Sequence, residues 1–248
     1  MRGKRLVGVC AVGCGIAMLV ACGSSTSKTA STSSGSRPAS SSSTASTSSS
    51  AAPASLTQLK KIVLQPADLP RGWKGTPYRP DPSDAAVQAA FVKCVGVRNT
   101  DPDTVAEANS EDFALGDADI SSSAHSYRSQ TDVDTDTASL RNPKYAPCDE
   151  QLAKKQLATS LPAGAMIESA SVKITPGSAG GPANVVGTEA GTFKVSANGQ
   201  QVPVYVTGVY ITGPLIEAEV DTENVGSPVP ASVVNALVAT VAARAAEG

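Results

Sequence analysis

Residues 184–221 read NVVGTEAGTFKVSANGQQVPVYVTGVYITGPLIEAEVD, and this stretch decides the fold. Its β-branched residues and alternating polarity predict three strands, over residues 184–197, 201–212 and 215–221. Asn198-Gly199 between the first two is typical of a type I′ hairpin, because both residues tolerate a positive φ. Gly213-Pro214 predicts the second reversal. Three strands joined by such short reversals are expected to pair antiparallel.

The last of these strands carries a row of carboxylates. Apolar and acidic residues alternate along it: Ile216, Ala218 and Val220 with Glu217, Glu219 and Asp221. Successive side chains of a strand point to opposite faces, so the pattern predicts one buried apolar face and one solvent-exposed acidic face. We interpret Glu217 and Glu219 as part of that solvated face and not as a catalytic pair.

The flanking sequence predicts helices and further strands. Apolar residues recur at helical spacing after Ser55, Ser83, Pro147 and Pro230, which predicts helices over residues 56–63, 84–95, 148–160 and from 230 onward. Residues 120–129 and 167–175 have strand character. This order predicts an α+β fold: a single domain over residues 56–248, with an antiparallel sheet of about five or six strands flanked by helices. A nucleotide-binding doubly wound sheet is disfavoured, because no βαβ run has a Gly-rich turn.

The first 22 residues have the character of an export signal. Three basic residues at positions 2, 4 and 5 precede an uncharged apolar run over residues 6–20, which is too short for a comfortable membrane span. Leu19-Val20-Ala21-Cys22 then looks like the lipobox of bacterial lipoproteins. That resemblance implies that residues 1–21 are removed and that an acylated Cys22 anchors the exported protein on the extracytoplasmic face of the cell membrane. The alternative is an ordinary secretory signal with a chance cysteine.

A low-complexity linker follows the acylated cysteine in residues 22–55. From Gly23 onward it is almost wholly Ser, Thr and Ala, with Pro38 and Pro53. Such a segment has almost nothing apolar larger than Ala to bury, so we expect it to be disordered. Ser/Thr-rich stalks with Pro in exported proteins are commonly O-glycosylated, which leaves a glycan-bearing stalk and a bare spacer as alternatives.

The charge balance argues against nucleic acid as a partner. The chain has 20 Lys and Arg against 22 Asp and Glu, a formal net charge of −2, and removal of the three basic signal residues makes it −5. A mildly acidic exported protein is not suited to neutralising phosphates.

Two cysteines remain for the globular domain. Cys10 and Cys14 lie in the signal and Cys22 is assigned to the lipid, which leaves Cys94 and Cys148. An even pair in an exported chain predicts a disulfide. Closing a loop of about 55 residues would stabilise the fold by about 4 kcal/mol. A reactive thiol is the alternative, but neither cysteine has C-x-x-C spacing or a nearby histidine.

Catalytic motifs are sparse. His125 is the only histidine, which excludes sites that need two imidazoles, and no serine lies in a G-x-S-x-G motif. A Ser-His-acid triad would have to combine His125 with a serine at position 121, 122, 123 or 126. We therefore predict that the protein is not an enzyme and needs no cofactor, with an envelope hydrolase that uses His125 as a remaining alternative.

Alternating carboxylates in Asp132-Val133-Asp134-Thr135-Asp136 suggest a calcium loop, but the rest of that motif is missing. An EF-hand requires Gly at its sixth position and Glu at its twelfth, where this chain has Thr137 and Pro143. We interpret the carboxylates as acidic residues at the start of a helix that runs toward Leu140, where they complement the helix dipole. No metal site is predicted.

Four polar aromatic side chains are candidate ligand contacts. His125 and Tyr127 share one face of the predicted strand over residues 120–129, and Tyr205 and Tyr210 lie on the long strand over residues 201–212. Packing in the core or at its rim is the alternative role for each of them.

The order of these features resembles small lipoproteins of mycobacteria and related actinobacteria. After the lipobox and stalk come the opening Asp68-Leu69-Pro70-Arg71-Gly72-Trp73, a helix with Cys94, a Ser-rich strand, Cys148, strand hairpins and a final helix. The globular part is similar in outline to the extracellular sensor-like domain of a mycobacterial serine/threonine kinase and, more loosely, to PsbP/Mog1-like lipoproteins. The resemblance implies an antiparallel sheet flanked by helices with a ligand-binding cleft, and it supplies no catalytic residue.

The functional expectation is therefore a non-enzymatic, lipid-anchored envelope protein. It would act as a binding or sensor-like module for a small molecule, an envelope lipid or glycan, or a protein partner. A carrier of envelope lipids is the main alternative, and it would need a large apolar cavity.

Overall fold

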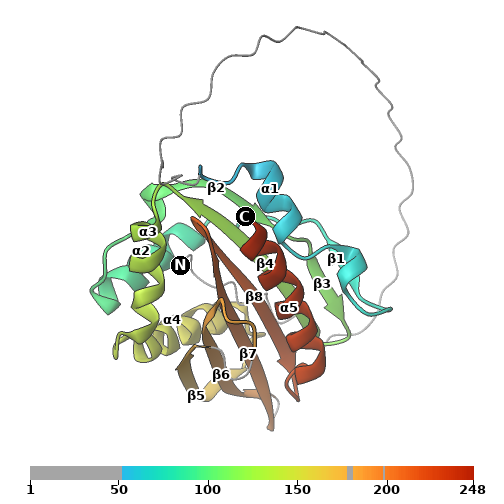
Figure 1. The fold of residues 1–248 in the computed structure, drawn as a ribbon. Helices are drawn as coiled ribbons and strands as arrows, with labels where there is room; N and C mark the ends of the chain where they lie inside the picture. Colours follow the sequence, from blue (N-terminus) through green and yellow to red (C-terminus); the bar gives the residue numbers. More distant parts are fainter. Residues whose placement is uncertain (1–51, 178–180, 198) are drawn as a thin grey trace, which may run out of the picture. The chain divides into compact units, whose positions relative to one another are not determined.

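The computed structural model describes residues 52–177, 181–197 and 199–248 (Figure 1). The predicted signal peptide, Cys22 and the linker up to residue 51 lie outside the described residues, and so does Asn198. The first helix begins at Leu56, where the sequence predicts that the globular domain starts.

An antiparallel sheet of eight strands forms the centre of the domain. The strands are β1 (Lys74–Thr76), β2 (Thr104–Asn109), β3 (Asp112–Leu115), β4 (Ala118–Tyr127), β5 (Met166–Pro176), β6 (Val185–Ala197), β7 (Gln200–Gly213) and β8 (Ile216–Val225). Their order is β1-β3-β4-β8-β7-β6-β5, and β2 also pairs with β4. The α+β class is as predicted, whereas the sheet has more strands than the expected five or six.

The three additional strands are short and precede the first predicted one. β1 pairs with β3, and both β2 and β3 pair with β4, β3 along its first half and β2 along its second. None of the three has a run of alternating apolar residues, and β1 consists only of Lys-Gly-Thr. β4 fixes β2 and β3 directly, and β3 fixes β1. Their own residues give little indication that they form strands.

Five α-helices are described, each close to a predicted one or to the acidic segment after Ser129. They are α1 (Leu56–Ile62), α2 (Asp84–Val95), α3 (Gln130–Ala138), α4 (Tyr145–Ser160) and α5 (Ala231–Glu247), with short 3-10 turns η1 (Pro66–Asp68), η2 (Asp101–Asp103) and η3 (Ser139–Arg141). Ser55 and Gln58 form a capping box at α1. Ser83 precedes α2 as predicted, but its side chain makes no capping hydrogen bond; it donates to Asp81 instead.

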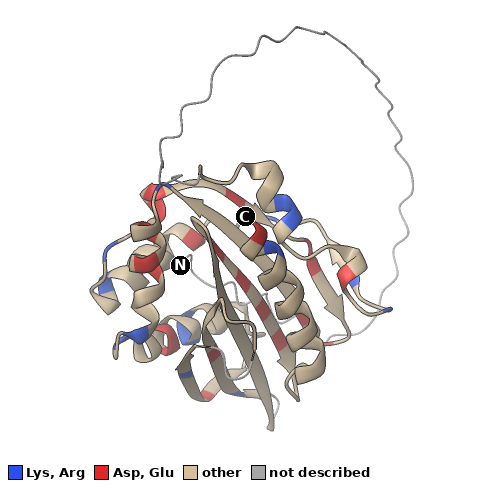
Figure 2. Ribbon diagram, in the orientation of Figure 1, with Lys and Arg blue, Asp and Glu red and all other residues tan. Residues whose placement is uncertain are grey.

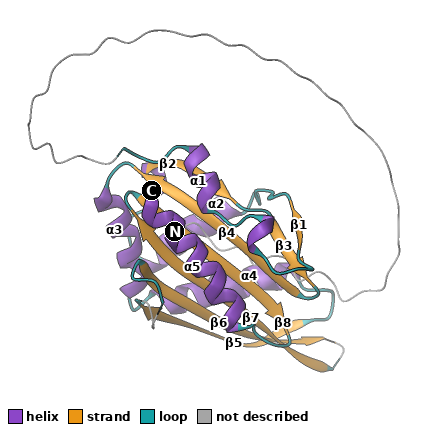
Figure 3. Ribbon diagram, turned by 45° about the vertical axis from the view of Figure 1, so that its right-hand side comes forward, coloured by secondary structure: helices purple, strands orange, loops and turns teal. Residues whose placement is uncertain are grey.

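Helices cover both faces of the sheet (Figures 1 and 3). α1 and α5 pack on one face, where Leu59, Ile211 and Val241 belong to the main apolar core. α4 packs against β5 and α2 packs against α4 on the other face, around Phe91, Tyr145 and Leu157. The final helix thus covers an apolar face of the sheet, as its apolar spacing predicts.

Two serines of β4 form hydrogen bonds to the backbone on either side of α1. Ser122 Oγ accepts a hydrogen bond of 2.8 Å from the Leu64 amide, and Ser126 Oγ donates one of 2.8 Å to the Ala54 carbonyl. Both serines are buried, so these bonds satisfy polar groups that would otherwise be costly. The Ser-rich character of this strand is therefore partly structural.

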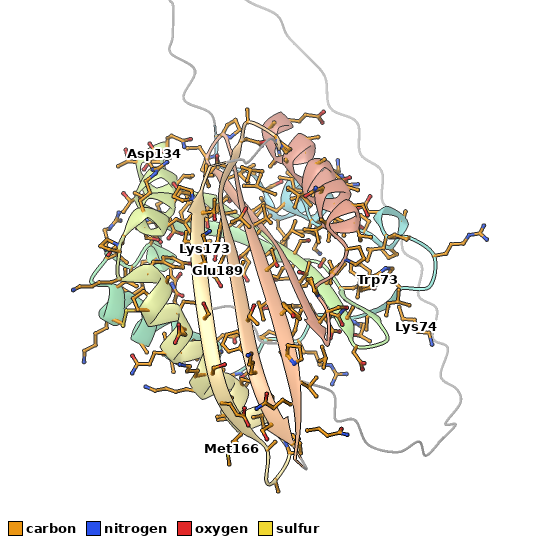
Figure 4. All side chains as sticks on the ribbon, turned by 90° about the horizontal axis from the view of Figure 1, so that it is seen from below. Trp73, Lys74, Asp134, Met166, Lys173 and Glu189 are labelled. Atoms are coloured by element: carbon orange, nitrogen blue, oxygen red, sulfur yellow. A yellow bond between two sulfur atoms is a disulfide. The ribbon has the colours of Figure 1, made fainter. Side chains whose placement is uncertain are left out.

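The Asp68-Leu69-Pro70-Arg71-Gly72-Trp73 opening is fixed by the last helix. The Arg244 guanidinium of α5 donates to both carboxylate oxygens of Asp68, at 2.8 and 2.7 Å. A bidentate pair of this kind orients both partners. Trp73 follows the turn, is half-buried, and packs on the core beneath α1 and α5. Figure 4 shows Trp73 and Lys74 at the β1 side of the sheet, opposite the β5 edge that carries Met166 and Lys173.

Both predicted hairpins are present. Ala197 of β6 pairs with Gln200 of β7, and Gly199 just before β7 has a φ of 78°. Gly213 pairs with Ile216, so Pro214 and Leu215 form the centre of the second turn, and Leu215 adopts a φ of 58°. The predicted reversal at Gly213-Pro214 is thus shifted by one residue.

The predicted disulfide joins Cys94 of α2 to Cys148 of α4, with their Cα atoms 5.8 Å apart. Beside it, the rings of Phe91 and Tyr145 meet edge to face, with centroids 4.8 Å apart. The bond therefore holds α2 against α4 within a small apolar cluster.

The acidic face of β8 is buried, and the prediction of a solvent-exposed face is wrong. Glu217 is 3% exposed, Glu219 8% and Glu223 6%. They alternate with the apolar residues as expected, but the helical layer of α2, α3 and α4 and the segment before α2 lie over that side of the sheet. Figure 2 shows acidic residues recurring along the β8 ribbon in the middle of the domain. A period of two predicts which residues share a face, but not what covers it.

Candidate functional site

A pocket of about 520 Å³ opens between the central strands and the beginning of α2. Its size is within the usual range of small-molecule sites. One wall is formed by polar residues of β2, β3, β4 and β8, and the other by the segment from Tyr78 to Gln88 together with Asp101.

Strand register assembles the sheet wall. Across β4, Glu107 of β2 stands opposite His125, and Asn109 opposite Ser123. On the other side of β4, Glu219 of β8 also stands opposite Ser123. Directly paired residues point to the same face, so these side chains share the floor of the pocket.

Carboxylates extend that floor in both directions. Asp221 follows Glu219 on β8 and pairs with Ser121, and Asp112 of β3 lies at the margin. Asn109 Nδ2 donates a 2.9 Å hydrogen bond to Glu107 Oε1, which fixes the position of that carboxylate.

The opposite wall also carries carboxylates. Asp81 lies in the turn before α2, where its Oδ1 accepts hydrogen bonds from the Ser83 amide at 2.7 Å and the Ser83 hydroxyl at 2.8 Å. Asp84 is the first residue of α2, and Asp101 begins η2. Together with the floor, seven carboxylates line the pocket, and no Lys or Arg is among the described residues that line it.

Gln88 reaches the pocket from α2 with an unsatisfied acceptor. Its side chain is 4% exposed, and its Oε1 has no hydrogen-bond partner among the described residues. Leaving a buried polar atom unpaired costs about 1–3 kcal/mol. Gln88 is three residues before Phe91, and the buried residues of α2 are Gln88, Phe91 and Val95, so Gln88 is a polar residue on the buried face of this helix.

Tyr127 belongs to a buried acidic group beside the pocket. Its hydroxyl donates a 2.7 Å hydrogen bond to Asp136 Oδ2 of α3. Glu217 pairs with His125 across the strands, and burial, together with the nearby Asp136, raises the pKa of Glu217 well above its usual value. Tyr127 itself is buried and does not line the pocket.

The other two candidate tyrosines lie on opposite faces of β7. Tyr210 is buried in the cluster around the disulfide, where its hydroxyl is 2.9 Å from the Tyr145 hydroxyl and donates to Glu189 Oε2 at 3.3 Å. Tyr205 is half-buried on the α5 side of the sheet, because it is five residues from Tyr210 in a strand of period two. Of the four predicted ligand residues, only His125 therefore lines the pocket.

A second carboxyl pair lies further along β4 and β8. Asp119 pairs with Glu223. Burial and the adjacent Asp119 raise the pKa of Glu223 to about 8, and burial with Asp112 and Asp117 raises the pKa of Asp119 to about 6.

The structure brings His125 together with two of the serines that a triad could use. Ser121, Ser123 and His125 all line the pocket. Over residues 52–177, 181–197 and 199–248, no group of three or more His, Cys, Asp or Glu could hold a metal ion. Asp132 of the calcium-like segment instead pairs with Arg98 at 3.2 Å and caps α3 with Ser129.

Several pocket residues escaped the sequence analysis. Asp81, Asp84, Gln88 and Asp101 lie outside the strands, and Glu107 lies in a strand that was not predicted. One signal was present: polar side chains alternate along both β4 and β8, at Ser121, Ser123 and His125 and at Glu217, Glu219 and Asp221. Two polar faces on adjacent central strands indicate a hydrated space between the sheet and whatever covers it.

No known protein-family model and no curated protein sequence matches this chain. In the described part of the chain, no helix is both long and apolar enough to cross a membrane.

Proposed function

We propose that this chain is an exported, lipid-anchored envelope protein that acts as a non-enzymatic binding module, with the acidic pocket as its ligand site. The observation that carries the proposal is the lining of that pocket: seven carboxylates, a buried glutamine with an unpaired oxygen, and no Lys or Arg among the described residues. Such a lining favours a positively charged ligand.

The alternatives receive less support. A lipid carrier requires a cavity with an apolar lining, and this pocket is lined by carboxylates, serines and an amide. A hydrolase would have to use His125 with a serine of the same pocket as its nucleophile, whereas most of the polar lining consists of carboxylates. The resemblance to actinobacterial sensor-like lipoproteins remains a part of this proposal, and the predicted lipobox at Cys22 supports its membrane anchor.

A pocket-filling variant tests the proposal. Ala85 is exposed on α2 and lines the pocket, whereas Ala89 is exposed one turn later and does not. We expect Ala85→Trp to obstruct the pocket and Ala89→Trp to leave it open, because only Ala85 lines the pocket. Both residues are exposed, so we expect both variants to fold. The full chain and both variants would be purified from the native envelope, and small molecules released by denaturation would be compared by mass spectrometry.

The expected result is a cationic compound that accompanies the wild type and Ala89→Trp but is lost from Ala85→Trp. Thermal unfolding would verify that both variants fold. The proposal is wrong if no compound distinguishes the two variants while both are folded.

A further inference from the structure

We propose that a second surface of the domain, the open face of β5, β6 and β7, is a docking site for an anionic polysaccharide. The open face consists of Ser171 and Lys173 of β5, Thr192 and Lys194 of β6, and Tyr205 and Thr207 of β7. It lies on the side of the sheet away from α4 and the acidic pocket, so its ligand is independent of the proposed function.

The core shows which way the side chains of β6 point. Phe193 packs with Leu157 of α4. Because successive side chains of a strand point to opposite faces, Thr192 and Lys194 point away from α4. Lys194 is exposed and Thr192 is partly exposed, so this side of β6 is open to solvent.

The neighbouring strands continue the same face. Thr192 pairs with Ser171 of β5 on one side and with Tyr205 of β7 on the other. The next row along the strands consists of Lys173, Ala190 and Thr207. Directly paired residues point to the same side of a sheet, so the two rows form one continuous surface.

The described helices cover this half of the sheet on the α4 side. α5 packs on β7 and β8, and Figures 1 and 3 show β5 and β6 beyond its edge. Lys173, Ala190 and Lys194 are exposed. The open face is about 10 Å wide across the three strands, and residues 169–175 of β5 extend for about 20 Å. A partner can therefore lie along the strands over several of its units.

The charge of the open face is opposite to that of the whole chain. Its six residues include Lys173 and Lys194 and no Asp or Glu, whereas the chain has a formal net charge of −2. Glu189 of β6 points to the α4 side, where it accepts a hydrogen bond from a buried tyrosine. Glu168, near the beginning of β5, accepts one from Gln201. The open face is therefore complementary to an anionic partner.

The positions of the two lysines favour a chain with repeated charges. Lys194 pairs with Ser169, which precedes Lys173 by four residues, or about 13 Å along the strand. A single small anion does not contact two groups at this separation, whereas an extended polyanion does. A second copy of this chain is disfavoured, because its own open face would place lysines against lysines.

The other side chains of the face favour a sugar over a peptide or a simple polyanion. Ser171, Thr192 and Thr207 carry hydroxyl groups, which both donate and accept hydrogen bonds and so match the hydroxyl groups of a sugar. Tyr205 is partly exposed among them and presents an apolar ring together with a hydroxyl. Such a ring can contact the C–H groups of a sugar while its hydroxyl remains hydrogen-bonded.

The test is isothermal titration calorimetry on the full-length chain in a nonionic detergent. The probes are hexagalacturonate, the uncharged maltohexaose, and the peptide hexaglutamate. We expect hexagalacturonate to bind at least tenfold more tightly than either of the others, because only hexagalacturonate has both sugar hydroxyls and repeated negative charges. Its affinity should fall as salt rises, since ions screen the attraction.

Two lysine variants with a matched control assign the binding to this face. Lys173→Gln and Lys194→Gln should each weaken hexagalacturonate binding about threefold and together about tenfold, as expected for exposed ion pairs. Lys155→Gln makes the same charge change at an exposed position of α4, on the other side of these strands. It should leave the affinity unchanged.

A charge introduced into the face gives a stronger test. Ala190→Glu places a carboxylate between the two rows and should weaken binding about tenfold, whereas Ala158→Glu at an exposed position of α4 should not. Circular dichroism and thermal unfolding would verify the fold, and the lysine variants decide the question if Ala190→Glu is unfolded. The proposal is overturned if hexagalacturonate does not bind, if maltohexaose or hexaglutamate binds as tightly, or if the lysine variants behave like Lys155→Gln.

Discussion

Glu223 and Asp119 face each other across β8 and β4, where Glu223 is buried and Asp119 is partly buried. Glu223 is buried, and its Oε2 makes no hydrogen bond within the described residues. A charged carboxylate in such surroundings is unfavourable, so the neutral acid is preferred and the pKa of Glu223 rises to about 8. At neutral pH this residue consequently holds a proton in the folded state that it would release in the unfolded state.

Replacement of Glu223 by Gln tests this at the scale of a single residue. A carboxyl whose folded pKa exceeds its unfolded value supports the fold at low pH and loses that contribution as the pH rises through the folded value. The loss should fall between pH 4.5 and about 8. Over this range we expect the wild type to lose on the order of 3 kcal/mol more free energy of unfolding than Glu223→Gln.

Urea denaturation at pH 5 and pH 8 measures that difference. Glu247→Gln, at an exposed position on α5, is the control and should follow the wild type. Parallel pH profiles for the wild type and Glu223→Gln would contradict the raised pKa.

At the scale of an element, the end of β7 and the last turn of α5 approach each other closely. A Cβ atom at Gly213 would lie 1.9 Å from the carbonyl oxygen of Ala245 and 2.8 Å from its carbonyl carbon. Both atoms belong to helix backbone, which cannot rotate away. Glycine at this position therefore allows α5 to pack on the sheet down to its last turn.

Gly213→Ala should separate the two elements and destabilise the domain by about 1–3 kcal/mol, the usual cost of overpacking. Gly75→Ala is a matched control, because its Cβ would also meet an atom at 1.9 Å, but that atom is the end of the flexible Glu111 side chain. Thermal or urea unfolding of the two variants measures the costs. Equal destabilisation would mean that the backbone contact at α5 does not limit the packing.

The length of an element decides whether its sequence predicts it. β6, β7 and α5 are long and were predicted, because many of their residues repeat one pattern. β1, β2 and β3 are three to six residues long and depend on β4, so their own residues carry little information. Part of the pocket could not be predicted for the same reason, since Glu107 and Asp112 belong to those short strands. The carboxylates of β8 were placed on the right face, but their burial is set by helices distant in sequence.

At the scale of the whole molecule, the decisive prediction concerns the anchor. Cys22→Ala removes the only thiol that the lipobox could acylate, so we expect the protein to leave the membrane fraction or to accumulate with its first 21 residues attached. Cys14→Ala changes a cysteine inside the same apolar segment and should leave processing and membrane retention intact. Fractionation and intact-mass measurement follow both effects. Normal processing and full membrane retention of Cys22→Ala would contradict lipid anchoring.

The bond between Cys94 and Cys148 has a consequence for when the pocket exists. It joins α2 to α4, and α2 carries Asp84, Ala85 and Gln88, part of one wall of the pocket. Thiols stay reduced in the cytosol and pair in oxidising compartments outside it. In a newly made chain with reduced cysteines, α2 would therefore not be linked to α4. The affinity of the pocket for its ligand would increase when the disulfide forms. Under the proposed function, the protein would then become able to bind its ligand only after export.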